Sequence, residues 1–371
     1  MKILYDGQVY SIQNVGGVSR YFNNIISRLP PNFKPYMIIP HGPRLELPTH
    51  SNLRTLTCGR FRLERLEHIS WRLYTLGRML GKKYIESVTK GFDVAHPTYY
   101  NLLTQHELKE YRCPVVVTVY DMIHDLFPDD AMNAAAEIET KRRAVLNAQA
   151  VICISENTKQ DLLNSYSIPE RKVSVVHLAS GIDSTLAHGN DPVPTRPYYL
   201  YVGKRTGYKN FDRLLRAFAN AFGGSIDMAL CVVGDPFTLS ERELIAQLNL
   251  TNRIEYYGQV NDAQLAKLYR CSVAFVYPSL YEGFGIPLLE AMSCGTAVVA
   301  SNCSSIPEVV GDAAVFFDPA SIDDMTTALL SLSDNESYRQ CLIARGQKRA
   351  RMFSWDKAVE QTLKVYQSVQ T

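Results

Sequence analysis

Short apolar runs alternate with amphipathic segments along the chain, and this rhythm occurs twice. The runs are rich in Val, Ile, Tyr and Phe, as buried strands are, and the segments between them carry apolar residues at helical spacing. The pattern predicts an α/β protein with two open, doubly wound parallel sheets. The strands expected in the first half are Lys2–Tyr5, Tyr36–Pro40, Val94–His96, Val115–Tyr120, Val151–Ile154 and Val173–His177. Those expected in the second half are Tyr198–Val202, Ala229–Val233, Arg253–Tyr257, Val273–Tyr277, Ala297–Ala300 and Ala314–Phe316.

A proline-rich segment, Gly181 to Pro197, separates the two halves. It lacks apolar periodicity, which is typical of a linker, and we interpret it as a hinge. A length of 371 residues also favours two domains over one. We expect a first domain at 1–185, a second at 186–354, and a helix over 355–371. The residues expected on one face of that helix are Trp355, Ala358, Val359, Leu363 and Tyr366.

The stretch Y-P-S-L-Y-E-G-F-G-I-P-L-L-E, from Tyr277 to Glu290, places two carboxylates around a glycine-rich turn. Gly283 and Gly285 lack Cβ atoms, so the backbone there can approach a ligand closely. Pro287 suits the first turn of a helix, whose free N–H groups suit a diphosphate. Glu282 and Glu290 can accept hydrogen bonds from vicinal hydroxyl groups. The stretch therefore predicts a site for a phosphorylated sugar.

A basic loop, Y-V-G-K-R-T-G-Y-K-N-F from Tyr201 to Phe211, follows the first strand of the second half. Arg205 could bind a diphosphate as a bidentate fork and Lys209 as a point charge, with the backbone at Gly203 close to the ligand. Lys204 competes with Arg205 for the first role. The plainer alternative is a basic loop that caps a helix.

The segment N-V-G-G-V-S-R-Y, 14–21, follows the first strand and opens a helix. At Gly16 and Gly17 the backbone N–H groups could meet an anion at the helix N-terminus. The dinucleotide pattern G-x-G-x-x-G does not occur in the chain, which disfavours an NAD enzyme.

A third polar segment, V-V-T-V-Y-D-M-I-H-D-L-F-P at 116–128, follows a strand expected to be buried in the first half. The strand would deliver Tyr120, Asp121, His124 and Asp125 to the ligand edge of that sheet. A lone histidine in a loop is often structural, so His124 is either a ligand-binding residue or a structural one.

Composition narrows the class of protein. The chain is 46% hydrophobic and 20% charged, as globular proteins are, and a formal net charge of +2 argues against a nucleic-acid binder. Eight scattered cysteines without C-x-x-C spacing favour a reducing compartment over disulfides or a metal site. No signal-like start and no long apolar run are found, so we expect a cytoplasmic protein that can associate with a membrane surface.

The stretch around Glu282 and Glu290 resembles the E-x7-E signature of glycosyltransferase family 4, the retaining nucleotide-sugar transferases known as glycosyl transferases group 1. This resemblance implies the GT-B fold, in which two Rossmann-like domains face across a cleft and a C-terminal helix returns to the first domain. It also implies that Glu282 contacts the donor sugar, Glu290 the ribose, and the backbone of Gly283, Phe284, Gly285 and Ile286 the diphosphate.

The same resemblance implies that the basic loop stabilises the departing nucleoside diphosphate and that the Gly16–Gly17 loop contacts the donor phosphate. Members of the family often carry His where this chain has Tyr120, so either Tyr120 or His124 fills that role. His96 resembles a position on the acceptor side, or is a packed residue before a proline. Retention of configuration follows from the resemblance, and no D-x-D pair occurs, so we expect no metal or other cofactor.

The resulting expectation is a retaining hexosyltransferase of surface polysaccharide synthesis, with GDP-mannose as the first candidate donor and a UDP-sugar as the alternative. The expected acceptor is an oligosaccharide, linked to polyprenyl diphosphate, at the inner face of the cell membrane. The basic stretch 60–90 is either a membrane-binding surface or an ordinary amphipathic helix. A nucleotide-sugar epimerase and a non-catalytic sugar-nucleotide binding protein remain as alternatives.

Overall fold

A computed structural model describes residues 1–12, 16–40, 47–58, 83, 86–103, 107–130, 133–205, 207–224 and 227–370. The chain divides into two compact units, of which unit 1 contains Met1–His177 and Trp355–Thr371 and unit 2 contains Leu178–Ser354. The chain therefore first passes from unit 1 to unit 2 after His177, eight residues before the expected boundary at 185. The proline-rich segment belongs to unit 2, where it includes the short 3-10 helix Ser184–Leu186. Most of the basic stretch 60–90 lies outside the described residues.

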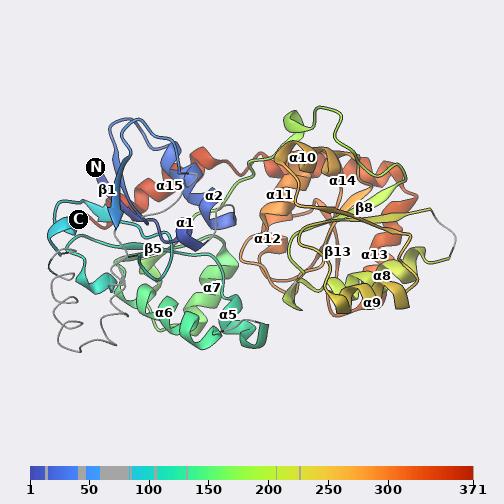
Figure 1. The fold of residues 1–371 in the computed structure, drawn as a ribbon, viewed down its shortest axis with the longest axis horizontal. Coiled ribbons are helices and arrows are strands. Elements are labelled where there is room, and N and C mark those ends of the chain that lie inside the picture. Colours follow the sequence, from blue (N-terminus) through green and yellow to red (C-terminus); the bar gives the residue numbers. More distant parts are fainter. Residues whose placement is uncertain are drawn as a thin grey trace. The chain divides into compact units, whose positions relative to one another are not determined.

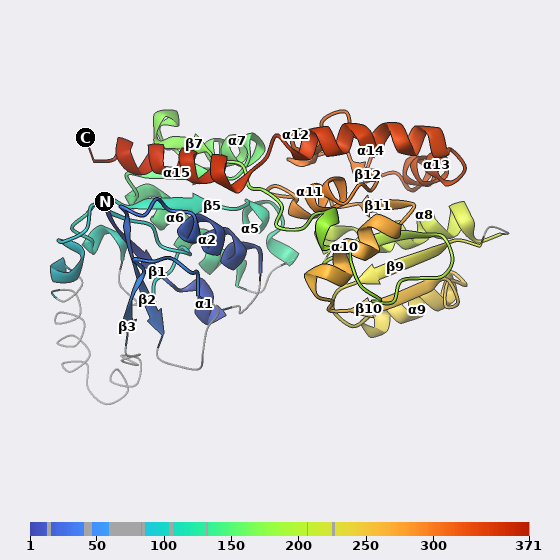
Figure 2. The ribbon, with the colours of Figure 1, turned by 90° about the horizontal axis from the view of Figure 1, so that it is seen from above.

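Unit 1 is built on parallel strands (Figures 1 and 2). They are β1 (Lys2–Asp6), β2 (Lys34–Pro40), β3 (Arg54–Cys58), β4 (Val94–Ala95), β5 (Val116–Val119), β6 (Ala150–Cys153) and β7 (Val173–Val175). The orders β3-β2-β1-β4 and β5-β6-β7 are joined by a parallel bridge between Ala95 and Val115. Figure 2 shows β1, β2 and β3 side by side. Strand β3 was not predicted from the sequence.

Helices connect and cover these strands. They are α1 (Val9–Ile12), α2 (Gly17–Ser27), α5 (Ile123–Leu126), α6 (Ala134–Asn147), α7 (Glu156–Ser165) and α15 (Trp355–Ser368). Helix α2 buries Tyr21, Phe22, Ile25 and Ile26, which share one face because they are three and four residues apart. Helix α15, red in Figure 1, packs against α2, although the two are at opposite ends of the sequence.

Unit 2 contains one sheet of parallel strands in the order β10-β9-β8-β11-β12-β13. The strands are β8 (Tyr198–Val202), β9 (Ala229–Val233), β10 (Ile254–Gly258), β11 (Ala274–Tyr277), β12 (Val298–Ser301) and β13 (Ala314–Phe317). The helices are α8 (Phe211–Phe222), α9 (Leu239–Gln247), α10 (Asp262–Cys271), α11 (Ile286–Ser293), α12 (Ile306–Val310), α13 (Ile322–Ser333) and α14 (Glu336–Ala350). The expectation of doubly wound parallel sheets is confirmed.

The strand order of unit 2 reverses between its two central strands, β8 and β11. Helix α8 packs with α13 on one face of the sheet, and α11 packs with α14 on the other (Figure 1). The chain therefore leaves β8 and β11 toward opposite faces. In open α/β sheets this topological switch point, at the carboxyl ends of the strands, is where ligands bind.

Candidate functional site

Two loops lie at the switch point of unit 2. One connects β8 to α8 and carries Lys204, Arg205 and Lys209, and the other connects β11 to α11 and carries Glu282. A backbone hydrogen bond of 2.8 Å from Leu280 N to Tyr208 O ties the loops together. The fold thus brings together two motifs that are more than 70 residues apart in the sequence.

Lys209 and Glu282 form an ion pair in which Nζ lies 2.6 Å from Oε1. Their side chains are 18% and 9% exposed. The Lys209 ammonium also lies 5.2 Å from the ring centroid of Tyr208 and 5.7 Å from that of Tyr277. The Tyr277 hydroxyl donates to Glu282, and burial together with the Glu282 charge raises the pKa of Tyr277 well above its usual value. The pair therefore presents one fixed cation and one fixed carboxylate at the edge of the sheet.

Two serines between β12 and α12 hold the backbone around Glu282. The Glu282 N–H donates to Ser304 Oγ at 2.9 Å, and Ser305 Oγ donates to the carbonyls of Glu282 at 2.8 Å and Phe284 at 3.1 Å. Ser305 is fully buried. The signal in the sequence was a serine directly before an Ile-Pro helix start, but the sequence alone does not show which carbonyl this serine binds.

The glycine turn has the backbone that the sequence predicted for a close approach. Gly285 has φ 103° and ψ 57°, in the left-handed region, and an added Cβ would lie 2.8 Å from Leu288 Cδ1. Helix α11 begins directly afterwards at Ile286, with Pro287 in its first turn. Phe284 is buried, and its ring meets that of Phe353 edge-on at 5.8 Å, so its backbone rather than its side chain is at the ligand edge. The backbone of Gly283 completes the turn.

Glu290 lies one turn inside α11 and is 5% exposed. Its Oε2 accepts a 3.1 Å hydrogen bond from the hydroxyl of Tyr269 on α10. The sequence suggested Glu290 as a ribose ligand but gave no sign of Tyr269, whose hydrogen bond orients the carboxylate.

The Arg205 side chain is largely buried and paired with a carboxylate of α9. Its side chain is 4% exposed, and Nε donates to Glu241 Oε1 at 2.7 Å. Nη2 donates to the carbonyls of Asp235 at 2.7 Å and Pro236 at 2.9 Å. The guanidinium also lies 4.7 Å from the ring centroid of Phe237. Arg205 therefore anchors its loop to the start of α9 through Nε and Nη2, while its buried Nη1 has no hydrogen-bond partner among the described residues.

Lys204, the alternative to Arg205, is exposed in the same loop. Next to it, Gly203 has φ 129°, and no atom lies within 4 Å of where its Cβ would be. Gly234 follows β9 and must be glycine, since a Cβ would lie 2.5 Å from Gly203 O. The loop after β8 thus offers an open backbone and the exposed Lys204, next to the paired Lys209.

In unit 1, the segment after β5 carries the other predicted side chains. Tyr120 is half-buried, its hydroxyl donates to Thr98 O at 3.3 Å, and burial raises its pKa well above the usual value. Asp121 Oδ1 accepts from Ile123 N at 3.0 Å, which forms the turn that starts α5. His124 lies on α5 and is half-buried. The structure brings the three residues together on one short segment.

Gly16 caps the N-terminus of α2 in an extended conformation, and Gly17 is its first residue. The Gly16 N–H donates to Ser19 Oγ at 3.0 Å, so the helix start supplies its own acceptor for this group. No atom lies within 4 Å of a Cβ placed on Gly17. Asn14 lies outside the described residues.

His96 is not a ligand-binding residue in this structure, which corrects that expectation in favour of a packed residue. It is fully buried, with Nδ1 2.6 Å from Tyr366 Oη and Nε2 2.8 Å from Thr118 Oγ1. Burial lowers its pKa to about 3. Tyr366 belongs to α15, so the histidine helps to dock the C-terminal helix within unit 1.

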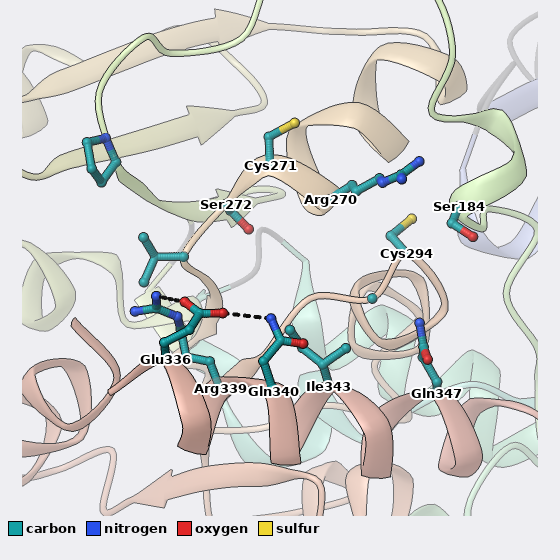
Figure 3. Close-up of a pocket in the computed structure, with 13 residues that line it drawn as sticks. Ser184, Arg270, Cys271, Ser272, Cys294, Glu336, Arg339, Gln340, Ile343 and Gln347 are labelled. Carbon is teal, nitrogen blue, oxygen red and sulfur yellow. Dashed lines mark hydrogen bonds and ion pairs between the residues drawn. The ribbon is translucent and has the colours of Figure 1, made fainter. Parts of the chain in front are cut away.

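A cavity of about 730 Å³ in unit 2 lies away from these loops. Its wall includes residues that precede β8, β11 and β12, so it lies at the amino ends of the strands, the edge opposite to Glu282. Figure 3 shows Glu336 bonded to Arg339 and Gln340 on α14, with Arg270 and Cys271 of α10 across from them. This cavity is distinct from the candidate site.

Within the described ranges, no group of three or more His, Cys, Asp or Glu side chains has the geometry to hold a metal ion. The same residues include no helix that is long and apolar enough to span a bilayer.

Comparison with known proteins gives consistent matches over both units. The family model "Glycosyltransferase Family 4" matches residues 15–184, and "Glycosyl transferases group 1" matches residues 186–349. O-antigen chain mannosyltransferase B of Escherichia coli is 29% identical over 74% of this chain and 72% of the relative. Alpha-maltose-1-phosphate synthase of Mycobacterium tuberculosis is 30% identical over 73% of this chain and 78% of the relative.

Among solved structures, HepE of Anabaena in complex with UDP and glucose superimposes with a TM-score of 0.72. The alignment covers 99% of this chain and 100% of that one at 16% identity, which establishes the GT-B fold. The matched models, the relatives and the loops around Glu282 agree, and the chain belongs to the family 4 glycosyltransferases, the glycosyl transferases group 1.

Proposed function

We propose that this glycosyltransferase is a retaining, metal-independent hexosyltransferase that moves mannose from GDP-mannose onto a growing oligosaccharide of a surface polysaccharide. The observation that carries the proposal is the Lys209–Glu282 pair beside the Gly285 turn at the switch point of unit 2. The mannose donor is supported by similarity to O-antigen chain mannosyltransferase B and to a mycobacterial MMP alpha-(1->4)-mannosyltransferase, which is 27% identical.

In this mechanism the diphosphate of the donor lies against the turn and the N-terminus of α11, whose N–H groups favour an anion. Lys209 and the exposed Lys204 neutralise the charge that develops on the leaving diphosphate. The acceptor hydroxyl attacks on the face from which the diphosphate leaves, and a diphosphate oxygen takes its proton, so configuration is retained without a protein nucleophile. Glu282 accepts hydrogen bonds from the sugar hydroxyls.

The donor is tested by thermal stabilisation in the presence of EDTA with GDP, UDP, ADP and TDP, their sugars and CMP-sugars, since a ligand that binds the native state raises the melting temperature. We expect GDP and GDP-mannose to give the largest shift. Glu290→Gln, which keeps an acceptor for Tyr269, should reduce the shift, whereas Glu243→Ala, an exposed carboxylate of α9, should not. Absence of a shift with every nucleotide would contradict a donor site.

Transfer itself is tested with the selected donor and a synthetic mannosyl acceptor, followed by determination of the anomeric configuration of the product. Conversion of the donor in the absence of acceptor would favour an epimerase, and an inverted product would contradict the same-face mechanism. A largest shift with UDP instead would favour the UDP-sugar alternative, for which the similarity in fold to HepE, solved with UDP and glucose, is the supporting observation.

The proposed acceptor is lipid-linked and reached at the inner face of the membrane. The support is a cavity of about 460 Å³ in unit 1 lined by Lys83, Glu86, Ser87, Lys90 and Arg112, of which the three cations face solvent. Basic surfaces of this kind attract anionic lipid headgroups. Sedimentation with phosphatidylglycerol vesicles should show salt-sensitive binding that decreases in Lys83→Gln/Lys90→Gln. Equal binding to neutral vesicles would contradict the electrostatic attraction.

A further inference from the structure

Helix α5 of unit 1 is a single turn, Ile123–Leu126, that follows the carboxyl end of β5. An isolated turn of this length is not stable, because helix nucleation costs more than one turn of hydrogen bonds returns. Neither of its apolar residues, Ile123 and Leu126, is buried, so hydrophobic packing contributes little to its position. Something else must hold the turn that carries His124.

A buried lysine on α6 holds it. The Lys141 side chain is 2% exposed, and its Nζ lies 2.6 Å from Asp125 Oδ2 and 3.2 Å from Asp121 O. The ammonium also lies 5.9 Å from the ring centroid of Tyr100. One cation thus binds the segment at both ends, before α5 through a carbonyl and within α5 through a carboxylate.

The second carboxylate oxygen is also taken. Tyr166, which follows α7, donates its hydroxyl to Asp125 Oδ1 at 2.8 Å. Burial, and after it the hydrogen bond to Asp125, raise the pKa of this tyrosine. Asp125 itself is 9% exposed, so both oxygens are directed into the protein and are not available to a ligand.

The cost of burying the Lys141–Asp125 pair indicates that the pair positions the segment after β5 and adds little to the stability of the fold. Removing a lysine and a carboxylate from water costs several times the energy of an ordinary hydrogen bond. Apolar or neutral groups of the same shape therefore often stabilise a fold at least as much as the buried pair does. An ammonium with three donors, however, fixes the geometry of each oxygen that it binds. A buried pair behind a loop therefore favours one loop conformation.

We propose that Lys141 is a positioning residue, which acts through Asp125 to hold His124 and Asp121 in place at the carboxyl edge of the unit 1 sheet. This inference rests on the proposed function, because it assigns the held segment to the reaction. Lys141 does not contact substrate. Neither Lys141 nor Asp125 was predicted to have this role, since a lysine in an amphipathic helix is usually solvated.

The test compares the double variant Lys141→Met/Asp125→Asn with wild type. Asn keeps an acceptor for Tyr166 and Met keeps the length of the lysine, so the fold should persist, which far-ultraviolet circular dichroism checks. Lys172→Met is the matched control, since Lys172 also binds α6, at the carbonyls of Val145 at 2.8 Å and Leu146 at 3.0 Å in its last turn.

We expect the double variant to lose about 10²-fold in kcat, the loss typical of a displaced group near the reacting atoms, with little change in KM for the donor. The imidazole signals of His124 in NMR spectra, assigned with His124→Gln, should shift. In the His124→Gln background the loss should be clearly smaller, because part of it acts through His124. Lys172→Met should leave kcat and the signals unchanged.

Unchanged His124 signals, or equal losses with and without His124, would overturn the proposal. The imidazole signals are read without any substrate, so they decide whether Lys141 positions His124 even if no donor supports transfer. Absence of transfer by wild type with every donor would instead contradict the proposed function. The two failures are therefore distinguishable.

Discussion

The stability of unit 1 should decrease below neutral pH because of His96. This residue is fully buried in a line of hydrogen-bonding groups, with Tyr366 on one side, Thr118 on the other, and Tyr5 Oη 3.3 Å beyond Tyr366. The neutral imidazole uses one nitrogen as donor and the other as acceptor. No carboxylate is among these partners, so a protonated imidazole would be buried without a counter-charge.

The magnitude follows from the two pKa values of His96. In the folded protein burial lowers the pKa to about 3, and in the unfolded chain it is about 6.5. Between these values the unfolded state binds more protons, so stability is complete above pH 6.5 and decreases as the pH falls toward 3. Each pH unit changes the free energy of unfolding by about 1.4 kcal/mol, which gives about 2 kcal/mol between pH 7.5 and pH 5.0. Because pH 5.0 lies well above 3, this result is insensitive to the folded-state value.

The assay is urea unfolding at pH 7.5 and pH 5.0, followed by the fluorescence of Trp355. The chain has two tryptophans, so a Trp71→Phe background makes Trp355, on α15 of unit 1, the only reporter. His96→Gln should lower stability at pH 7.5 but remove about 2 kcal/mol of the pH dependence. Tyr366→Phe should cost about 1–3 kcal/mol at both pH values and keep the dependence, because burial of the imidazole persists. An equal pH dependence in wild type and His96→Gln would refute the reasoning.

Four further outcomes are expected. Lys209→Ala should reduce turnover by about 10²-fold through loss of charge stabilisation, and unchanged turnover would count against the mechanism. Glu241→Gln should destabilise unit 2 by about 3 kcal/mol in urea unfolding, because the buried guanidinium of Arg205 loses its counter-charge; a change near zero would mean that Arg205 reaches solvent. Gly285→Ala should cost about 1–2 kcal/mol from its positive φ, plus the displacement of Leu288, and weaken nucleotide binding measured by calorimetry. Dialysis against EDTA should leave turnover unchanged, and restoration by a divalent ion would contradict metal independence.

The sheets could be predicted because parallel strands are buried on both faces and therefore read as continuous apolar runs. Strand β8, Tyr198–Val202, and strand β9, Ala229–Val233, have the predicted bounds. Strand β3, R-T-L-T-C, was missed because it alternates polar and apolar residues and pairs with β2 alone, at the edge of the sheet. An edge strand needs little apolar surface, so its sequence resembles a loop.

The candidate site was predictable where chemistry is local and not where it depends on distant partners. The turn at Gly285 and the helix start at Pro287 follow from adjacent residues, and the structure contains both. The ion pair of Arg205 was not predicted because its partner, Glu241, is 36 residues away, and the hydrogen bond that fixes His96 was not predicted because Tyr366 is 270 residues away. A charged or polar side chain is drawn inward only when the fold supplies a partner, which a sequence pattern does not show.

In both units, a buried ion pair among the described residues lies directly behind a candidate loop. Arg205–Glu241 fixes the loop after β8 to the start of α9, and Lys141–Asp125 fixes the segment after β5 to α6. A pair of this kind is a poor source of stability, because desolvation offsets most of the attraction, and surface loops rarely contain one. Its value here is that a loop at a ligand edge, which has few apolar contacts, is given a single conformation before any ligand binds. This argument predicts a separation of effects: neutral isosteres of both partners should keep the melting temperature and lose turnover, whereas removal of one partner alone should lower both.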